Sequence, residues 1–221
     1  MIDCELHSHT HYSRDSLNRL RDIIDACHKA GIDRIAITDH SEIAGALKAF
    51  QLAPELVIVS EEVKTTQGDL LCYFIQQKIP RGVTPEEAIQ RVHDQGGIVG
   101  PAHPLDTTRA GLGRDNVLRL REQIDFIEVF NARTIDPAMN DAAQALANEL
   151  GLPGIAASDA HLLSEIGASR VRMRTYTSPQ DFLAALRQAT LVNHSSSALV
   201  HFGSRWASML HQLGYDKERR E

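Results

Sequence analysis

The chain has 221 residues, of which 43% are hydrophobic and 24% are charged, so it can build one substantial core. Its formal net charge of −6 argues against a protein that coats nucleic acid through bulk positive charge. We expect a single domain over residues 1–221, in which residues 199–221 form a C-terminal amphipathic helix and a charged tail.

Targeting and redox signals are sparse. The N-terminal sequence lacks the basic and apolar regions of a signal peptide, and no run approaches the ~18 apolar residues that span a bilayer. Three cysteines without a CxxC motif indicate neither a disulfide framework nor a cysteine zinc site. We therefore expect a cytoplasmic protein with reduced thiols and no membrane partner. The oligomeric state stays open.

Short apolar runs alternate with helical patterns along the chain. Strands are expected at residues 2–6, 33–39, 56–63, 70–75, 97–103, 124–130, 153–158 and 170–176. Helices are expected at residues 16–31, 84–97, 136–151 and 178–189. The connection between the third and fourth strands is too short for a crossover and predicts a hairpin. The alternation otherwise favours an α/β fold with a parallel sheet or barrel.

Metal-binding side chains follow five of these strands. In "LHSHTHYSRDS" (residues 6–16), His7 and His9 occupy alternate positions and therefore share one strand face. The others are Asp39, His40, Glu61, Glu62, His103, Asp159 and His161. Each motif alone could be a helix cap, a turn or a solvated strand end. Together, at the rim where parallel strands end, they predict a centre for zinc, manganese or iron.

Six segments resemble the PHP (polymerase and histidinol phosphatase) family. In chain order they are "LHSHTHYSRDS", "AITDHSEI", "VSEEVKT", "GPAHP", "IEVFNAR" and "ASDAH", which fall within residues 5–161. The resemblance implies a distorted, TIM-like, seven-stranded (β/α)7 barrel. It also implies two or three divalent ions (Mn, Zn or Fe) and hydrolysis of phosphate esters.

The same resemblance implies three sets of metal ligands, and Glu62 belongs to two of them. They are His7, His9, Glu62 and Asp159 for the first ion, Asp15, His40 and His161 for the second, and Glu62 and His103 for the third.

Two positions depart from the family pattern. Asn131 stands where many members have histidine, so it is expected to be a weak carbonyl ligand of a weakly held third ion. Asp69 lies where some members place a histidine. Strand alternation allows only one of Glu61 and Glu62 to face the site, and the family motif favours Glu62. We expect His11 to stay outside the ligand set, in a solvated position.

The expected reaction is attack on phosphorus by a hydroxide that bridges two metals. The metals lower the pKa of the bound water from which this hydroxide forms. The proposed catalytic residues are Glu62, Asp159 and His161. The general acid stays open between His161 and a metal-bound water. The proposed phosphate-binding residues are Lys64, Arg109 and Arg133, which could instead be solvated loop charges.

The expected substrate is a small phosphorylated metabolite or a nucleotide. One alternative is a nuclease that trims the 5′ or 3′ end of an oligonucleotide. Only 5% of the residues are aromatic, so few side chains are present on which bases could stack. Others are hydrolysis of a carbon–nitrogen bond and a non-catalytic scaffold barrel, which should have lost its ligands.

Overall fold

The structure is a computed structural model that describes residues 1–197 and 200–213, without the side chains of residues 201 and 202. The strands are β1 (Ile2–Ser8), β2 (Arg34–Ile37), β3 (Val57–Lys64), β4 (Asp69–Tyr73), β5 (Ile98–Pro101), β6 (Ile127–Asn131), β7 (Gly154–Ala157), β8 (Arg170–Met173) and β9 (Thr190–Val192). The helices are α1 (Leu20–Ala30), α2 (Ala44–Leu52), α3 (Pro85–His93), α4 (Arg114–Leu120), α5 (Pro137–Leu150), α6 (Pro179–Leu186) and α7 (Val200–Gln212), with a short 3₁₀ helix η1 (Leu163–Glu165). Residues 199 and 214–221 of the predicted C-terminal segment lie outside the described residues.

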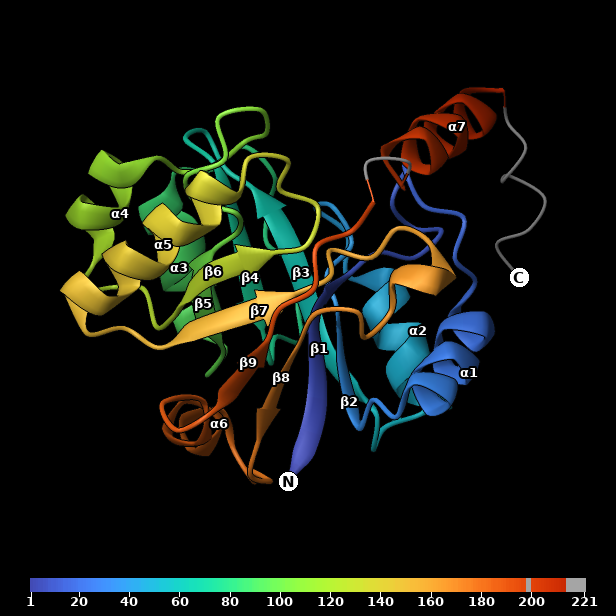
Figure 1. Cartoon of the computed structure of the whole chain (residues 1–221), viewed down its shortest axis with the longest axis horizontal. Helices are drawn as coiled ribbons and strands as arrows, with labels where there is room; N and C mark the ends of the chain where they lie inside the picture. The colour runs from blue at the N-terminus through green and yellow to red at the C-terminus, as the bar shows by residue number, and fades with distance from the viewer. Residues whose placement is uncertain (198–199, 214–221) are drawn as a thin grey trace.

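The strands form an open, curled sheet with the order β5-β4-β3-β2-β1-β8-β9 and a separate pair, β6-β7. Strands β1, β2 and β3 are parallel, and β4 returns antiparallel to β3, so the predicted hairpin is confirmed. Figure 1 shows α1 and α2 on one side of the strands and α3, α4 and α5 on the other.

The α/β class is confirmed, but the closed seven-stranded barrel is not. Strand β8 pairs antiparallel with β1 and occupies the edge of β1 that β7 would need for closure. The pair β6-β7 therefore meets the large sheet only locally. Ser8 forms an isolated bridge with Ala160 beyond β7, and the amide of Asp125 before β6 donates to the carbonyl of Val99 on β5 at 2.8 Å.

Three helices begin with the same local chemistry. Thr84, Asp136 and Ser178 each accept a hydrogen bond from a backbone amide in the first turn, and a proline follows each of them. Helix α1 begins at Leu20, later than the expected residue 16, because the preceding residues form turns beside the strand ends. Among the described residues, no helix is long and apolar enough to cross a membrane.

An aromatic cluster fills the core on the side away from the carboxyl ends of β1, β2 and β3. The rings of Tyr73 and Phe126 stack with centroids 5.0 Å apart, and Phe182 packs edge-on against Tyr73. The hydroxyl of Tyr73 donates to the carbonyl of Leu6 at 2.7 Å. Gly100 makes the approach of β5 possible, since a Cβ there would lie 2.4 Å from the carbonyl oxygen of Phe126. This packing fixes the strands whose ends carry the polar residues.

Candidate metal centre

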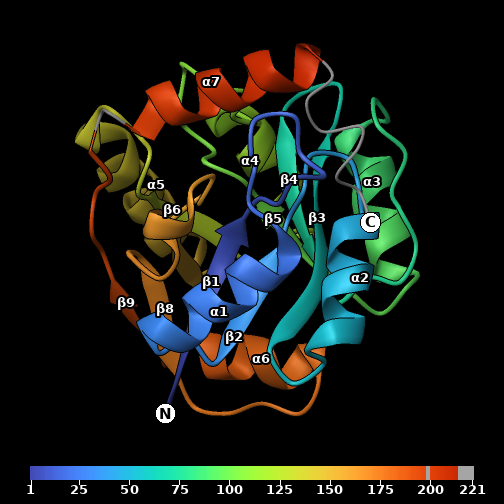
Figure 2. The same cartoon turned by 90° about the vertical axis from the view of Figure 1, so that its right-hand side faces the viewer.

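Histidines and carboxylates converge where β1, β2 and β3 end. Figure 2 shows α7 lying across this end of the strands. Three groups of potential ligand atoms each lie within 4.8 Å of one another. They are His7, His9 and Asp159; His9, His40 and His161; and Glu62, Asp69 and His103. All of these residues except His40 are buried.

The first group has the spacing of donors to one ion. His9 Nε2 lies 3.1 Å, and His7 Nε2 3.4 Å, from Asp159 Oδ1. Two ligand atoms about 2.1 Å from a shared tetrahedral ion are about 3.4 Å apart. His7 Nε2 is buried without a hydrogen bond, and a cation would satisfy it.

Side-chain partners fix which nitrogen of each histidine faces the group. Ser13 donates its hydroxyl to Asp39 at 2.8 Å, so its oxygen accepts from His9 Nδ1 at 3.2 Å. Glu128 accepts from His7 Nδ1 at 2.9 Å. In its neutral form each histidine therefore presents the lone pair of Nε2 to the group, which is the form that binds metals.

Glu62 joins the groups through its two oxygens. Oε2 lies 3.5 Å from Nε2 of His7 and of His9, whereas Oε1 lies 3.2 Å from His103 Nε2. Oε2 also lies 2.7 Å from His40 Nδ1, although it is buried and makes no hydrogen bond of good geometry. The neighbouring Glu61 faces the opposite side of β3 and accepts from the amide of Ile79 at 3.0 Å. A carboxylate placed between two donor groups is suited to bridging two ions.

Asp15 lies between the histidines of the second group. Its Oδ2 is 3.3 Å from His40 Nε2 and 3.2 Å from His161 Nε2, and its buried Oδ1 has no hydrogen-bond partner. His161 Nδ1 donates to the carbonyl of Asp159 at 2.8 Å, which leaves Nε2 as its free ligand atom. These three side chains can therefore hold a second ion, since His9 offers its only free nitrogen, Nε2, to the first group.

The third group contains Asp69 rather than Asn131. Asn131 donates from Nδ2 to Glu128 and Asp159, both at 3.2 Å, and its Oδ1 accepts from the amide of Arg133 at 3.0 Å. Its carbonyl oxygen thus already accepts a backbone hydrogen bond, which disfavours the expected role as a weak carbonyl ligand. Asp69, whose buried Oδ1 has no hydrogen bond, lies beside Glu62 and His103 instead.

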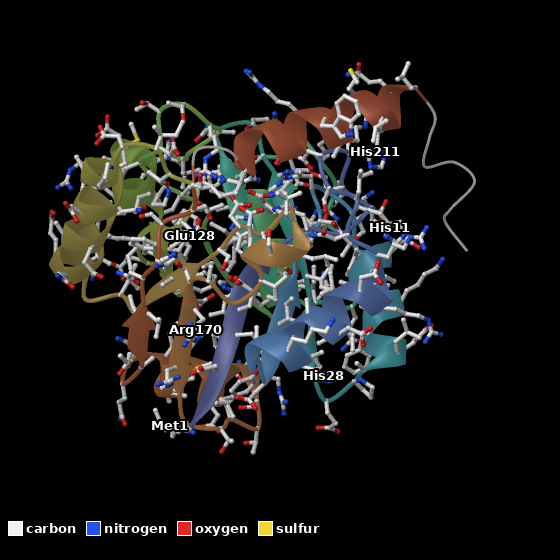
Figure 3. All side chains as sticks on the ribbon, turned by 45° about the vertical axis from the view of Figure 1, so that its right-hand side comes forward. Met1, His11, His28, Glu128, Arg170 and His211 are labelled. Atoms are coloured by element: carbon white, nitrogen blue, oxygen red, sulfur yellow. The ribbon has the colours of Figure 1, made fainter. Side chains whose placement is uncertain are left out.

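Two buried glutamates that were not predicted from the sequence support the centre. Glu128 accepts from His7, from the amide of His103 and from Asn131. Glu5 accepts from three backbone amides, including that of His7, and burial raises the pKa of Glu5 to about 7. The available signal was a charged residue inside an otherwise apolar strand. Figure 3 shows Glu128 in the interior and His28 at the periphery.

His11 lies outside the three groups, but the prediction that it is solvated is wrong. It is 8% exposed, its Nδ1 lies 3.2 Å from the carbonyl oxygen of Asn18, and its ring packs against Tyr12.

Backbone strain is concentrated at the centre. Among the described residues, four that are not glycine have positive φ, and three of them are at the centre: Ser41 (49°), His103 (30°) and Asp159 (52°). Such conformations cost about 1–2 kcal/mol each and cluster at functional sites.

The charges of the centre are strongly coupled. Burial opposes the charge of His7, but Asp159, Glu128 and Glu62 outweigh it and hold the pKa of His7 well above its usual value. Burial and then His161 and His40 lower the pKa of His9 to about 3. The buried carboxylates therefore require positive charge beside them, either from protonated histidines or from cations.

The three expected phosphate-binding residues differ in their partners. Arg109 Nη1 lies 2.5 Å from Asp159 Oδ2, and its Nε lies 2.9 Å from Asp106. Arg133 donates to the carbonyl of Val200 at 2.9 Å and approaches Glu165. Lys64 has no ion pair with the described residues. All three cations line a cleft of about 730 Å³ over the centre.

Two family models match the chain. The PHP domain model matches residues 5–79, and the PHP-associated model matches residues 137–191. The uncharacterised protein MJ1587 of Methanocaldococcus jannaschii is 35% identical over 155 residues, which cover 64% of this chain and 89% of that protein.

The chain belongs to the PHP family. Solved structures share the PHP-type fold of this chain at low identity. PsfC from Pseudomonas syringae PB-5123 is 18% identical, with a TM-score of 0.66 over 96% of this chain and 98% of that one. The lesion-specific endonuclease PfuEndoQ from Pyrococcus furiosus is 18% identical, with a TM-score of 0.63 over 86% of this chain and 57% of that one. Both PHP models stop short of α7, which forms part of the cleft.

Proposed function

We propose that this chain is a metal-dependent phosphoesterase that hydrolyses a small phosphate ester. The observation that carries the proposal is the position of Glu62, which turns one oxygen to His7 and His9 and the other to His103. Adjacent groups of mixed nitrogen and oxygen donors fit two or three ions of manganese, zinc or iron. When bound, such ions supply Lewis acidity and lower the pKa of coordinated water.

The proposed ligands are those inferred from sequence, with Asp69 in place of Asn131. His7, His9 and Asp159 would hold one ion, Asp15, His40 and His161 a second, and Asp69 and His103 a third, with Glu62 shared. The buried atoms without hydrogen bonds on His7, Asp15, Glu62 and Asp69 support this assignment, because an ion would satisfy all four.

Glu62, Asp159 and His161 are the proposed catalytic residues. Asp159 turns Oδ1 to the histidines while Arg109 and Asn131 hold Oδ2, so its ligand atom is fixed in direction. His161 also lines the cleft, and it is the chain's candidate proton donor to the leaving group in its doubly protonated form, in which Nε2 carries a proton and binds no metal.

Lys64 is the proposed binding residue for the reacting phosphoryl group. It lies two residues after Glu62 on β3 and therefore shares the face of the strand that carries this glutamate. Its ammonium has no ion pair with described residues and can bind phosphate oxygens. Arg109 and Arg133 are already engaged with carboxylates, so their proposed role shifts to holding Asp159 and the cleft wall.

The nuclease alternative rests on the shared fold of PfuEndoQ, whose name describes a lesion-specific endonuclease. The described residues that line the cleft include no Phe, Tyr or Trp on which a base could stack, which favours a small substrate.

The test begins with protein purified without chelator. Anomalous scattering from its crystals identifies each ion, and a panel of sugar phosphates, nucleotides and short oligonucleotides defines the activity. We expect hydrolysis of a small phosphate ester that chelation abolishes and added metal restores. Hydrolysis that survives complete removal of metal, or metal-loaded protein inactive on every phosphate ester, would refute the proposal.

A further inference from the structure

Helix α7 forms one wall of the cleft above the metal centre. Ser204, Arg205 and Ser208 line the cleft, whereas Trp206 and Met209 face solvent. Figure 2 shows the helix lying across the end of the strands, over the layer that holds the centre. It therefore shapes what can reach the proposed ions, although neither family model covers it.

Several contacts fix this wall to the rim. Arg133 donates to the carbonyl of Val200 and to the hydroxyl of Ser204, at 2.9 and 2.6 Å. Ala207 is 2% exposed, and a Cβ on Gly203 would lie 2.9 Å from the side chain of Leu162. These contacts at successive turns hold the cleft-lining side of α7 toward the centre.

Four cations line the cleft, and two of them are already paired. Arg109 pairs with Asp106 and Asp159, and Arg133 lies beside Glu165. Within the described part of the chain, Lys64 and Arg205 have no ion pair and remain available to a ligand. Lys64 stands beside Glu62 on β3, whereas Arg205 stands on the separate wall formed by α7.

We infer that Arg205 binds a second anionic group of the substrate, away from the phosphoryl group that reacts. The inference rests on the proposed function and names its substrate class: a small phosphate ester that also carries a carboxylate or another phosphate. Arg205 supplies a forked set of donors that matches either anion, and Ser208 adds a hydroxyl on the same wall. Apart from Ala110 and Ile135, the described residues that line the cleft carry polar or charged groups that could bind a polar substrate.

A matched series of three-carbon esters tests the inference. The series is 3-hydroxypropyl phosphate, 3-phosphooxypropanoate and propane-1,3-diyl bisphosphate, which differ only in the second group. We expect the metal-loaded protein to prefer an ester with a second anion, and Arg205→Gln to reduce that preference in kcat/KM by about 10- to 100-fold, the range of a charge-assisted hydrogen bond. The preferred member of the series distinguishes carboxylate from phosphate. Arg21→Gln, which removes an exposed charge on α1, should leave the preference unchanged.

A binding experiment separates this inference from the proposed activity. Calorimetry of the metal-loaded protein with propylphosphonate, 3-phosphonopropanoate and propane-1,3-diylbisphosphonate needs no turnover. Tighter binding of at least one compound with a second anion, which Arg205→Gln abolishes, would support the inference even if no ester were hydrolysed. Equal binding of all three compounds, or a preference that survives in Arg205→Gln, would overturn it whether or not the chain is a phosphoesterase.

Discussion

Buried polar groups at the metal centre and in the aromatic core beneath it differ in whether they have hydrogen-bond partners. At the centre, His7 Nε2 and Glu62 Oε2 are buried without hydrogen bonds, and His103 and Asp159 adopt strained backbone conformations. In the core, the hydroxyl of Tyr73 is satisfied and its ring is stacked. The contrast indicates that one layer holds the chain together while the other is organised to bind cations.

Removal of a proposed metal ligand should give the largest effect. We expect His9→Ala and Asp159→Ala to lower turnover by about 10³-fold or more, because each residue belongs to a donor group at the centre. Metal content and phosphoesterase rates measure the loss, and circular dichroism should show that the fold is kept.

His11→Ala is the matched control for these two variants, since His11 lies in the same histidine-rich segment but outside the donor groups. It should keep its metal and its activity. Wild-type activity in His9→Ala or Asp159→Ala would remove that residue from the centre.

A large change in the core should instead act on stability. Phe182 is fully buried and packs edge-on against Tyr73 and Tyr176, so Phe182→Ala should lower the free energy of unfolding by about 3–5 kcal/mol. Urea unfolding measures this loss. The metal content of the folded protein should not change, and if it fell with stability the two layers would not be independent.

An intermediate effect is expected where a buried carboxylate supports a ligand. Glu128→Gln removes the charge that holds His7 Nδ1 and should weaken metal binding by about 10- to 100-fold. Glu61→Gln, on the opposite face of β3, keeps an acceptor for the amide of Ile79 and should bind metal normally. Metal titration by calorimetry compares the two variants, and equal losses would contradict the different roles assigned to them.

The smallest effect lies far from the centre and depends on pH. His93 Nε2 lies 3.1 Å from Asp125, and this hydrogen bond raises the pKa of His93 above its usual value. The contribution to stability is therefore present below about pH 6.5 and is lost as pH rises through the elevated pKa. Because the pair is partly exposed, the contribution should stay below about 1 kcal/mol. Urea unfolding of wild type and His93→Gln should differ at about pH 5.5 and converge at about pH 9; a larger difference at high pH would reverse the assignment.

Local patterns predicted much of the fold because their causes are local. The capping residues Thr84, Asp136 and Ser178 marked three helices correctly. Helix α2 was missed because it begins at Ala44 after Ile43, which makes no capping hydrogen bond. Strand β9 is a half-exposed run of three residues that exists through its pairing with β8. The open sheet was missed because competition between β7 and β8 for the edge of β1 depends on tertiary structure.

The candidate site was predicted where its residues lie at the carboxyl ends of parallel strands, because the side chains there share one rim of the sheet. That rule placed His7, His9 and Glu62 at one rim, but it passed over Asp69 as a ligand, since this residue begins a strand. Because β4 runs antiparallel to β3, its first residue lies opposite Lys64 and reaches the same rim. Glu128 was missed because it acts from within a strand, through the second nitrogen of a ligand.

The position of β1 in the middle of the large sheet has a consequence for how the protein is made. Strand β1 pairs with β2 on one edge and with β8 on the other, and the donors to the proposed ions come from residues between His7 and His161. Contacts this distant in sequence form late and slowly. Cations would consequently be captured after most of the polypeptide has collapsed, so metal supply should influence the yield of active molecules more than the speed of folding.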